Sequence, residues 1–206
     1  MKLGQEQFEV LKKIQQYDPK AVIAGGAVRD YIFDKDFRDV DIFMSTKETP
    51  KFHMGLSMFI DYELENIFGD VEDLTRSLSE GYKSVSFLSF NLKSKGVLYN
   101  LIMSPKRLTN TMENTFDFTC NTIYHDGTKL YKSPLFNKFI ETMTIEKLGN
   151  TALDYKHIER AMKIADKLKC KLSDNMKDDI KRYEAFIKGG SKKNLFDKKL
   201  VGSGNW

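Results

Sequence analysis

The sequence from Ala21 to Met44, AVIAGGAVRDYIFDKDFRDVDIFM, decides how the rest of the chain is organised. It reads as a short apolar strand, a glycine turn, a short helix and a second strand that opens at Asp39. Two successive glycines, Gly25 and Gly26, permit a sharp turn, and we expect an unusual backbone angle at Gly26. N–H groups beside a helix start after such a turn suit the oxygens of a phosphate.

Asp39 and Asp41 stand two residues apart where the second strand opens. Alternate residues of a strand point to the same side, so the two carboxylates project together. Such a pair attracts divalent cations, and Mg²⁺ carrying substrate phosphates prefers hard oxygen ligands. A Gly-Gly turn alone is common, and an Asp-x-Asp pair alone is more often a solvated strand end. Their order within a short stretch, with Arg29-Asp30 after the glycines, favours a phosphate and metal site.

The chain of 206 residues is long enough for one domain with a sizeable core, or for a domain with a small appendage. Its 41% hydrophobic and 30% charged residues are typical of a globular protein. We find no apolar run of membrane-spanning length and no signal-peptide core, and so expect no membrane partner. Its two cysteines show no disulfide framework and no metal-binding spacing, which fits a reducing cytoplasm.

Positive charge gathers towards the C-terminal end. The net charge is +4, but twelve Lys and Arg stand against six Asp and Glu from Lys163 onward, which leaves the first 162 residues at about −2. Such an excess could hold an RNA backbone. Equally, it could be the solvated surface of a helix followed by a lysine-rich tail.

Hydrophobic periodicity predicts the secondary structure of the remaining chain. Helices are expected over residues 5–17, 27–33, 52–68, 153–172 and 173–188. Strands are expected over residues 21–24, 40–44, 84–91 and 97–103, with turns at residues 93–96 and 125–128. The polar residues 69–81 are expected to form a loop or to be partly helical. In the helix of residues 153–172, the expected apolar stripe is Ile158, Ala161, Met162, Ala165 and Leu168.

The run Gly25-Gly26-Ala27-Val28-Arg29-Asp30, followed by Asp39-Val40-Asp41, resembles the signature of a known family. This is the class II tRNA nucleotidyltransferase and bacterial poly(A) polymerase family of the polymerase-beta-like nucleotidyltransferase superfamily. The resemblance covers about residues 20–185 and implies an α+β fold. It predicts a nucleotidyltransferase head with a small mixed or antiparallel sheet over residues 1–148, a helical neck over residues 149–190 and a basic flexible tail over residues 191–206.

The same resemblance implies roles for the residues of the signature. Asp39 and Asp41 would be the catalytic residues and would hold Mg²⁺ in a two-metal site, with Mn²⁺ as an alternative ion. The nucleotide would be bound by the residues of the glycine turn and the helix after it, Gly25, Gly26, Arg29 and Asp30. Members of the family often place a third acidic residue near Asn100, whose amide cannot supply a carboxylate charge.

A second motif, Asp117-Phe118-Thr119-Cys120-Asn121, resembles the family's Arg-Arg-Asp-Phe-Thr-Ile-Asn-Ala. The resemblance implies that Asp117 and Asn121 contact the ribose or the triphosphate, although such residues could also be a satisfied polar pair at a strand start. Thr115 and Phe116 stand where the family has two arginines that help to hold the triphosphate. We therefore expect different phosphate contacts in this chain, through Arg29.

A third motif begins at Asp154 and resembles the family's Glu-Asp-Pro-Leu-Arg-Ile-Leu-Arg. Its acidic residue and arginine act in the family as a template that pairs with the base of CTP or ATP. Asp154 and Arg160 match the motif, and His157 replaces the template arginine, so the resemblance implies that these three residues read the base. A histidine lacks the planar fork of an arginine, so base selection should differ from CCA addition.

The resemblance implies a Mg²⁺-dependent enzyme of tRNA processing type, which transfers a nucleotide from an NTP (ATP or CTP) to an RNA 3′ end, with tRNA as the first acceptor. The alternatives are a toxin-type or protein-modifying nucleotidyltransferase, or a catalytically inactive nucleotide- or RNA-binding relic. The retained Asp39 and Asp41 argue against the relic. The short chain, Asn100 and the absent arginines argue against an ordinary CCA-adding enzyme, whose body and tail domains are not expected here.

Overall fold

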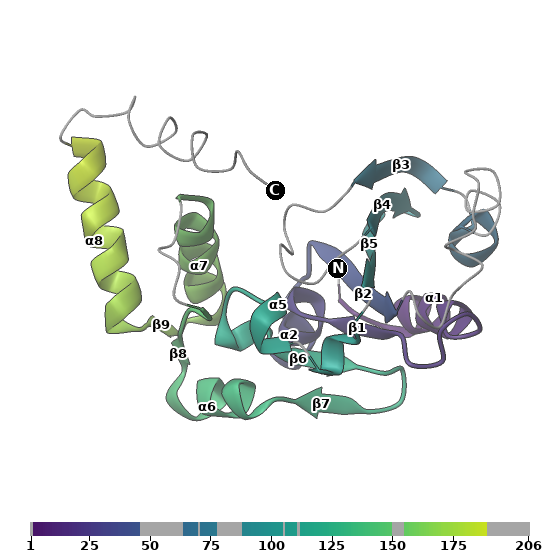
Figure 1. Ribbon diagram of the computed structural model, residues 1–206, viewed down its shortest axis with the longest axis horizontal. Coiled ribbons are helices and arrows are strands. Elements are labelled where there is room, and N and C mark those ends of the chain that lie inside the picture. Colours follow the sequence, from purple (N-terminus) through teal and green to yellow (C-terminus); the bar gives the residue numbers. More distant parts are fainter. Residues whose placement is uncertain are drawn as a thin grey trace, which may run out of the picture. The chain divides into compact units, whose positions relative to one another are not determined.

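The computed structural model describes residues 2–45, 64–69, 71–77, 88–104, 106–110, 112–149 and 155–188. These residues belong to two compact units, residues 1–149 and residues 150–206 (Figure 1). The first unit contains the sheet and the aspartate strand, and the second consists mainly of helices.

The first unit is built on a seven-stranded sheet with the strand order β3-β4-β5-β2-β1-β6-β7. Its strands are β1 (Val22–Ala24), β2 (Asp39–Ser45), β3 (Val71–Ser77), β4 (Leu88–Ser94), β5 (Val97–Ser104), β6 (Ile123–His125) and β7 (Leu130–Lys132). Strands β2 and β5 run parallel, and the other neighbouring pairs of this sheet are antiparallel. The predicted α+β fold with a mixed sheet is therefore confirmed.

Helices and short elements complete the first unit. They are α1 (Gln5–Ile14), α2 (Gly26–Ile32), α5 (Met112–Thr115), α6 (Pro134–Thr142), the 3₁₀ helices η1 (Leu108–Asn110) and η2 (Thr119–Asn121), and the short strand β8 (Thr144–Ile145). Residues 64–68 are also helical. Helix α6 begins after Ser133, whose hydroxyl accepts the N–H of Phe136, with a proline in the first turn.

Alternation along the central strands gives the sheet two different faces. Tyr99 of β5 is buried on one face, where its ring lies 5.1 Å from that of Phe68. Burial raises the pKa of Tyr99, while a hydrogen bond with Gln7 of α1 opposes the shift. Helix α1 and residues 64–68 therefore cover this face. The next residue, Asn100, points to the other face, together with Asp41.

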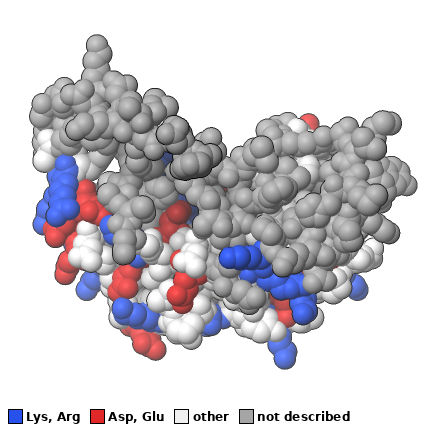
Figure 2. Space-filling view, in the orientation of Figure 1, with Lys and Arg blue, Asp and Glu red and all other residues white. Residues whose placement is uncertain are grey.

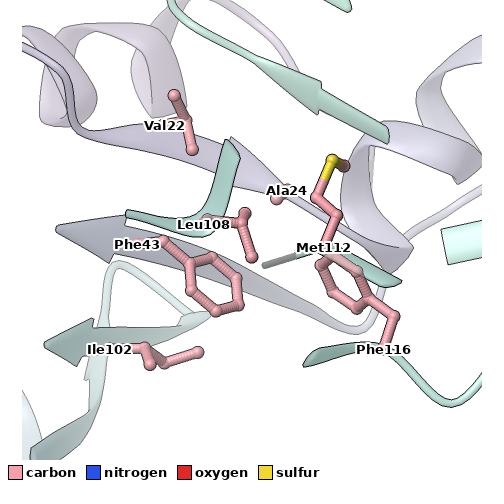
Figure 3. Close-up of a cluster of buried hydrophobic side chains, with 7 residues drawn as sticks. All are labelled: Val22, Ala24, Phe43, Ile102, Leu108, Met112 and Phe116. Carbon is pink, nitrogen blue, oxygen red and sulfur yellow. The ribbon is translucent and has the colours of Figure 1, made fainter. Parts of the chain in front are cut away.

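An apolar cluster covers part of this second face (Figure 3). It combines side chains of three strands with side chains of η1, α5 and the residue after α5, namely Val22, Ala24, Phe43, Ile102, Leu108, Met112 and Phe116. Burying a side chain of this size contributes about 1.5–3 kcal/mol. Because Ala24 is the register partner of Asp41, the cluster ends beside the aspartate.

The second unit contains α7 (Tyr155–Leu168), β9 (Lys171–Leu172) and α8 (Asp174–Lys188). Tyr155 of α7 stacks on Tyr183 of α8, with ring centroids 5.4 Å apart. The buried side chains of α7 are Ile158, Ala161, Ile164 and Leu168. The predicted stripe was wrong at Met162, which is 49% exposed, because Ile164 lies closer to the centre of the apolar face.

Several predicted boundaries were also wrong. Residues 71–77 form the strand β3 rather than a loop, because pairing with β4 supplies backbone partners that a polar composition does not reveal. Helix α1 ends at Ile14 rather than at residue 17, and α7 ends at Leu168, where Lys169 adopts a left-handed φ of 54°. Most of the predicted helix 52–68 and the tail 191–206 lie outside the described residues. Within the described ranges, no helix combines the length and the apolar character needed to span a membrane.

Candidate active site

Two aspartates project from β2 on the second face of the sheet, beside the apolar cluster. Asp41 is paired in register with Ala24 of β1 and with Asn100 of β5, so it lies in the middle of the sheet. It is 8% exposed, whereas the side chain of Asp39 is 24% exposed. The guanidinium of Arg38 donates a hydrogen bond of 2.6 Å to Asp39 Oδ2. The predicted same-side placement of the two carboxylates follows from their positions in one strand.

Gly25 brings the backbone close to Asp41. Its φ of 76° lies in a region that side-chain-bearing residues rarely adopt. A Cβ atom at this position would lie 3.0 Å from the ring of Phe116 and 3.7 Å from Asp41 Oδ2. The N–H of Gly25 donates to the carbonyl of Ile123 at 3.0 Å, which fixes the turn against β6. Only a glycine fits this turn without strain.

The expectation of an unusual backbone angle at Gly26 was wrong. Gly26 is the first residue of α2 and does not have a positive φ. A Cβ atom there would meet only Arg29 Nη2, at 3.8 Å. The special conformation belongs to Gly25 because that residue must leave β1 and turn into the helix within one step.

Asn100 lies beside Asp41, at the position where members of the resembling family often have a third acidic residue. Its amide Nδ2 donates a hydrogen bond of 2.7 Å to Asp41 Oδ1. Among the residues that the structure describes, no group of three or more His, Cys, Asp and Glu side chains could hold a metal ion. The site therefore offers two carboxylates and one amide.

These groups suit a hard divalent cation. Carboxylate oxygens are the usual protein ligands of Mg²⁺, which also keeps water and substrate phosphate oxygens in its shell. A Cβ atom on Gly25 would lie 3.7 Å from Asp41 Oδ2, so the backbone of the turn approaches this carboxylate closely. Asp39 and Asp41 would hold the ion, and the backbone of the glycine turn lies beside them.

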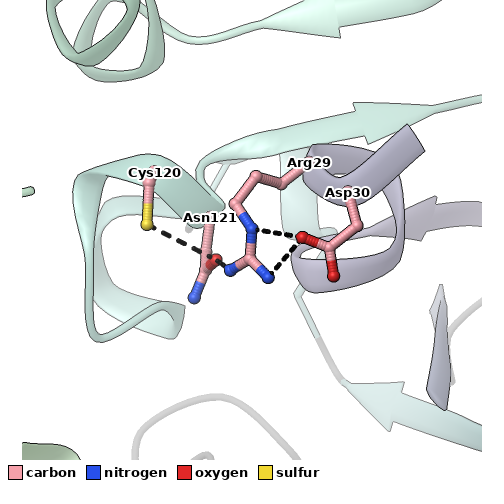
Figure 4. Close-up of polar contacts among 4 residues, drawn as sticks. All are labelled: Arg29, Asp30, Cys120 and Asn121. Carbon is pink, nitrogen blue, oxygen red and sulfur yellow. Dashed lines mark hydrogen bonds and ion pairs between the residues drawn. The ribbon is translucent and has the colours of Figure 1, made fainter. Parts of the chain in front are cut away.

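Arg29, Asp30 and Asn121 form a buried polar cluster behind the turn (Figure 4). The Arg29 guanidinium donates to Asp30 Oδ1 from Nε at 2.8 Å and from Nη2 at 2.7 Å. Its Nη1 donates to Asn121 Oδ1 at 2.6 Å, across 92 residues of sequence. Arg29 is 5% exposed and Asp30 is 3% exposed. The cluster ties α2 to η2.

Asn121 also carries a buried donor. Its Nδ2 has no hydrogen-bond partner within the described part of the chain, although the residue is only 1% exposed. Figure 4 shows this nitrogen on the side away from Arg29. A buried donor without an acceptor costs about 1–3 kcal/mol. An oxygen of a bound ligand would remove that cost.

Phe116 occupies a position where an arginine was expected by resemblance. It is 7% exposed, and its ring lies 5.9 Å from that of Phe43 in an edge-to-face arrangement. Thr115, at the other expected arginine position, is also buried. Asp117 is half-buried, and its carbonyl accepts the N–H of Leu148 at 2.7 Å. The apolar ring of Phe116 thus forms a wall beside the glycine turn, where the resemblance led us to expect an arginine.

The three residues predicted to read the base belong to the second unit. His157 is half-buried and Arg160 is exposed, both on α7, whereas Asp154 lies outside the described residues. Their role in base selection stays a prediction.

Sequence reasoning missed two features of the site. It noted Asn100 only as an absent carboxylate, and the hydrogen bond to Asp41 follows from the parallel pairing of β2 with β5. It also missed Phe116 as a wall against Gly25. The apolar residues Leu108 and Met112 before Phe116 were a signal that this segment packs on the sheet.

Comparisons with known proteins place the first unit in context. The family model described as Gabija anti-defense 2 family protein matches residues 2–142. A search among curated proteins found no match.

Solved structures of similar fold cover most of the chain. A structure described as a tRNA-processing enzyme in an apo form is 20% identical, with a TM-score of 0.57 over 90% of this chain and 49% of its own. The CCA-adding enzyme of Bacillus stearothermophilus in complex with CTP is 20% identical, with a TM-score of 0.57 over 86% of this chain and 43% of its own. The CCA-adding enzyme of Thermotoga maritima complexed with tRNA is 16% identical, with a TM-score of 0.58 over 85% of this chain and 40% of its own.

These likenesses establish the fold of a CCA-adding tRNA nucleotidyltransferase head. The chain spans less than half the length of those solved chains.

Proposed function

The chain belongs to the Gabija anti-defense 2 family, and from this premise we propose that it is a nucleotidyltransferase that acts through Asp39 and Asp41. One observation carries the proposal. Two carboxylates project from the central strand β2 beside a glycine turn, with the position of a Gly25 Cβ only 3.7 Å from Asp41 Oδ2. This arrangement places hard oxygen ligands beside the backbone of a turn that precedes a helix, a combination that suits a cation carrying phosphates.

In the proposed reaction, an acceptor hydroxyl oxygen forms a bond to the α-phosphorus of an NTP, and the bond from that phosphorus to the bridging oxygen breaks. Pyrophosphate leaves, and the hydroxyl proton passes to solvent or to a carboxylate of the site. A divalent ion supplies charge neutralisation and a lowered pKa of the hydroxyl when bound. Asp39 and Asp41 hold that ion, and Asn100 and Arg38 orient the two carboxylates.

The nucleotide would be bound by groups on two sides of the turn. The Asn121 Nδ2 is a buried donor that a ribose or phosphate oxygen would satisfy. Arg29 and Asp30 would position Asn121 rather than contact the nucleotide, because their side chains bind each other and Arg29 holds Asn121 in place. Gly25 and Gly26 would bind phosphates through their backbone. Asp117, which belongs to the same sequence motif as Asn121, would contact the ribose or the triphosphate. Asp154, His157 and Arg160 would read the base.

The favoured candidate for the acceptor is an RNA 3′ hydroxyl, and in particular that of a tRNA. The nucleotide donor would be ATP or CTP. The support is the fold, which is similar to that of enzymes whose structures are described as complexes with tRNA, with CTP and with an incoming ATP analogue. Mg²⁺ is the expected ion, and Mn²⁺ should replace it.

A protein hydroxyl of a defence component is the second candidate acceptor. The family description names an action against the Gabija defence. In addition, acidic residues accompany the lysines of the second unit. Lys163 pairs with Glu159 at 2.8 Å, and Lys177 pairs with Asp174 at 2.8 Å. Both signs of charge lie side by side on the described residues in Figure 2. Such a surface is a weaker attractant for RNA than the sequence count suggests.

Labelled NTPs test the proposal. The full chain is incubated with each NTP and Mg²⁺, with total RNA in one reaction and with proteins of Gabija-defended cells in another. Label in RNA supports the first acceptor, and label in protein supports the second. Asp39→Ala and Asp41→Ala should each abolish transfer, while Asp36→Ala, an exposed aspartate three residues before Asp39, should not.

Activity of either catalytic variant within about tenfold of the wild type, roughly 1.4 kcal/mol in the barrier, would overturn the assignment. Folding of each variant is checked by its thermal unfolding transition.

A further inference from the structure

Asn100 is an uncharged residue whose side chain contacts one of the two aspartates, Asp41. Parallel pairing places it directly beside Asp41, and its amide Nδ2 lies 2.7 Å from Asp41 Oδ1. A carboxylate at the same position would meet Asp41 Oδ1 with a second negative charge. The identity of residue 100 therefore sets the charge of the site without changing its backbone.

The hydrogen bond also orients the Asp41 carboxylate. Oδ1 is engaged by Asn100, and Oδ2 lies on the side of Gly25, 3.7 Å from the position of its Cβ. Asp41 is only 8% exposed, so water competes little with the hydrogen bond from Asn100. One oxygen is thus held by Asn100, and the other faces the glycine turn.

Asp39 also accepts hydrogen bonds from a protein donor, and here the donor carries a positive charge. Arg38 donates from Nη2 at 2.6 Å and from Nε at 3.2 Å to Asp39 Oδ2. Each carboxylate of the pair therefore already has a protein donor. Affinity for a divalent cation rises with the number of ligand charges, so two partly compensated carboxylates form a weak site by themselves.

We propose that Asn100 is a positioning residue that keeps the cation site weak in the free protein, so that the cation enters together with the triphosphate. The inference rests on the proposed nucleotidyltransferase function and extends it to the order of binding. Phosphate oxygens of the substrate supply the ligands and the negative charge that residue 100 does not. The cation then binds the site weakly by itself and more tightly when a nucleotide is present.

Direct binding of Mn²⁺ tests the inference without reference to activity. Free Mn²⁺ is measured by electron paramagnetic resonance during titration of the full chain, with and without a non-hydrolysable ATP analogue. Asn100→Asp places a carboxylate beside Asp41. Asn91→Asp is the matched control, because Asn91 is the register partner of Asn100 on β4 and adds the same charge one strand further away.

The wild type should bind Mn²⁺ weakly alone and roughly tenfold or more tightly with the analogue. Without the analogue, Asn100→Asp should bind Mn²⁺ roughly tenfold or more tightly than the wild type. The Mn²⁺ affinity of Asn91→Asp should stay within about threefold of the wild-type value, because attraction between charges falls with distance. Asn100→Ser, which adds no charge and is too short to hold Asp41, should bind Mn²⁺ with the analogue more weakly than the wild type.

If Asn100→Asp has the Mn²⁺ affinity of the wild type while Asp41→Ala abolishes binding, the role proposed for Asn100 is overturned. The proposed metal site at Asp41 would stand in that case. Loss of Mn²⁺ binding in every protein, with and without the analogue, would overturn both this inference and the proposed function. If Asn91→Asp gains as much Mn²⁺ affinity as Asn100→Asp, the gain is a general effect of added negative charge. That result would also overturn the role proposed for Asn100. Thermal unfolding of each variant confirms that the measured protein is folded.

Discussion

Gly25 shows most clearly how a single residue shapes the site. Its positive φ and its distance to Phe116 leave no room for a side chain, and its N–H is committed to Ile123. Gly26 has neither restriction. Two adjacent glycines therefore have different physical roles.

Gly25→Ala should lower the free energy of unfolding by about 1–3 kcal/mol, because alanine at this φ is strained and its Cβ would press on Phe116. Gly26→Ala should change it by less than about 1 kcal/mol and in the stabilising direction, since alanine is the better helix former. Urea unfolding of both variants measures the difference. Equal losses would show that the turn does not depend on the backbone angle of Gly25.

The buried cluster of Arg29, Asp30 and Asn121 matters at the scale of elements. It joins α2, which follows the glycine turn, to η2, which follows the wall residue Phe116. A charged pair with side-chain exposures of 6% and 4% depends on its own hydrogen bonds, because water cannot replace them. The orientation of the turn relative to η2 therefore depends on this pair.

Asp30→Ala should cost about 3–5 kcal/mol in the free energy of unfolding, because it leaves the guanidinium of Arg29 buried without its carboxylate. The control is Glu6→Ala, which removes an exposed ion pair with Lys95 and should cost far less. Chemical denaturation measures both values. A cost for Asp30→Ala no larger than that of the control would show that the cluster is not a structural tie.

The hairpin of β6 and β7 gives an element with a defined pH response. Partial burial acts to raise the pKa of Asp126, but hydrogen bonds from Lys129, Thr128 and Tyr131 outweigh it and lower the pKa to about 2. A folded pKa below the ordinary 3.8 stabilises the protein above that value, and the stabilisation is lost as the pH falls from about 4 to about 2.

Asp126→Asn should therefore lower the free energy of unfolding at pH 7 by about 1 kcal/mol or less, since solvent screens this turn. The gap between variant and wild type should close as the pH falls from about 4 to about 2. Thermal unfolding across this range measures it. A gap that stays constant would show that the charge of Asp126 does not stabilise the hairpin.

At the scale of the whole molecule, choice of the base would depend on the second unit. Asp154 and His157 resemble a template pair by sequence, and α7 carries the half-buried His157 and the exposed Arg160. The carboxylates proposed to carry the chemistry, Asp39 and Asp41, belong to the first unit. Catalysis and base selection would then be properties of different parts of the chain.

His157→Arg should shift the use of CTP and ATP relative to UTP and GTP by about tenfold or more, because hydrogen bonds that read a base are worth about 1–3 kcal/mol each. Lys156→Arg, at the neighbouring exposed position of α7, is the matched control and should leave the preference unchanged. Transfer rates with each NTP measure the ratio. Unchanged preferences in both His157→Arg and Asp154→Ala would leave these residues as ordinary surface groups.

By itself, the sequence determined the features that depend on near neighbours. The projection of Asp39 and Asp41 to one side follows from alternation within one strand, and the turn before them follows from two glycines. The strong periodicity of α7 likewise predicted a helix and most of its buried stripe, although not its end. Local backbone preferences encode these features, so they could be predicted without partners.

The tertiary structure alone decided the features that depend on distant partners. Ile123 and Phe116 select Gly25 rather than Gly26 for the positive φ, and the pairing with β4 makes a strand of the polar residues 71–77. Asn121, 92 residues away, directs Arg29 into the interior. Asn100 reaches Asp41 only because β5 lies parallel to β2. Each of these contacts joins residues that are far apart in the sequence, and periodicity carries no information about which distant groups will meet.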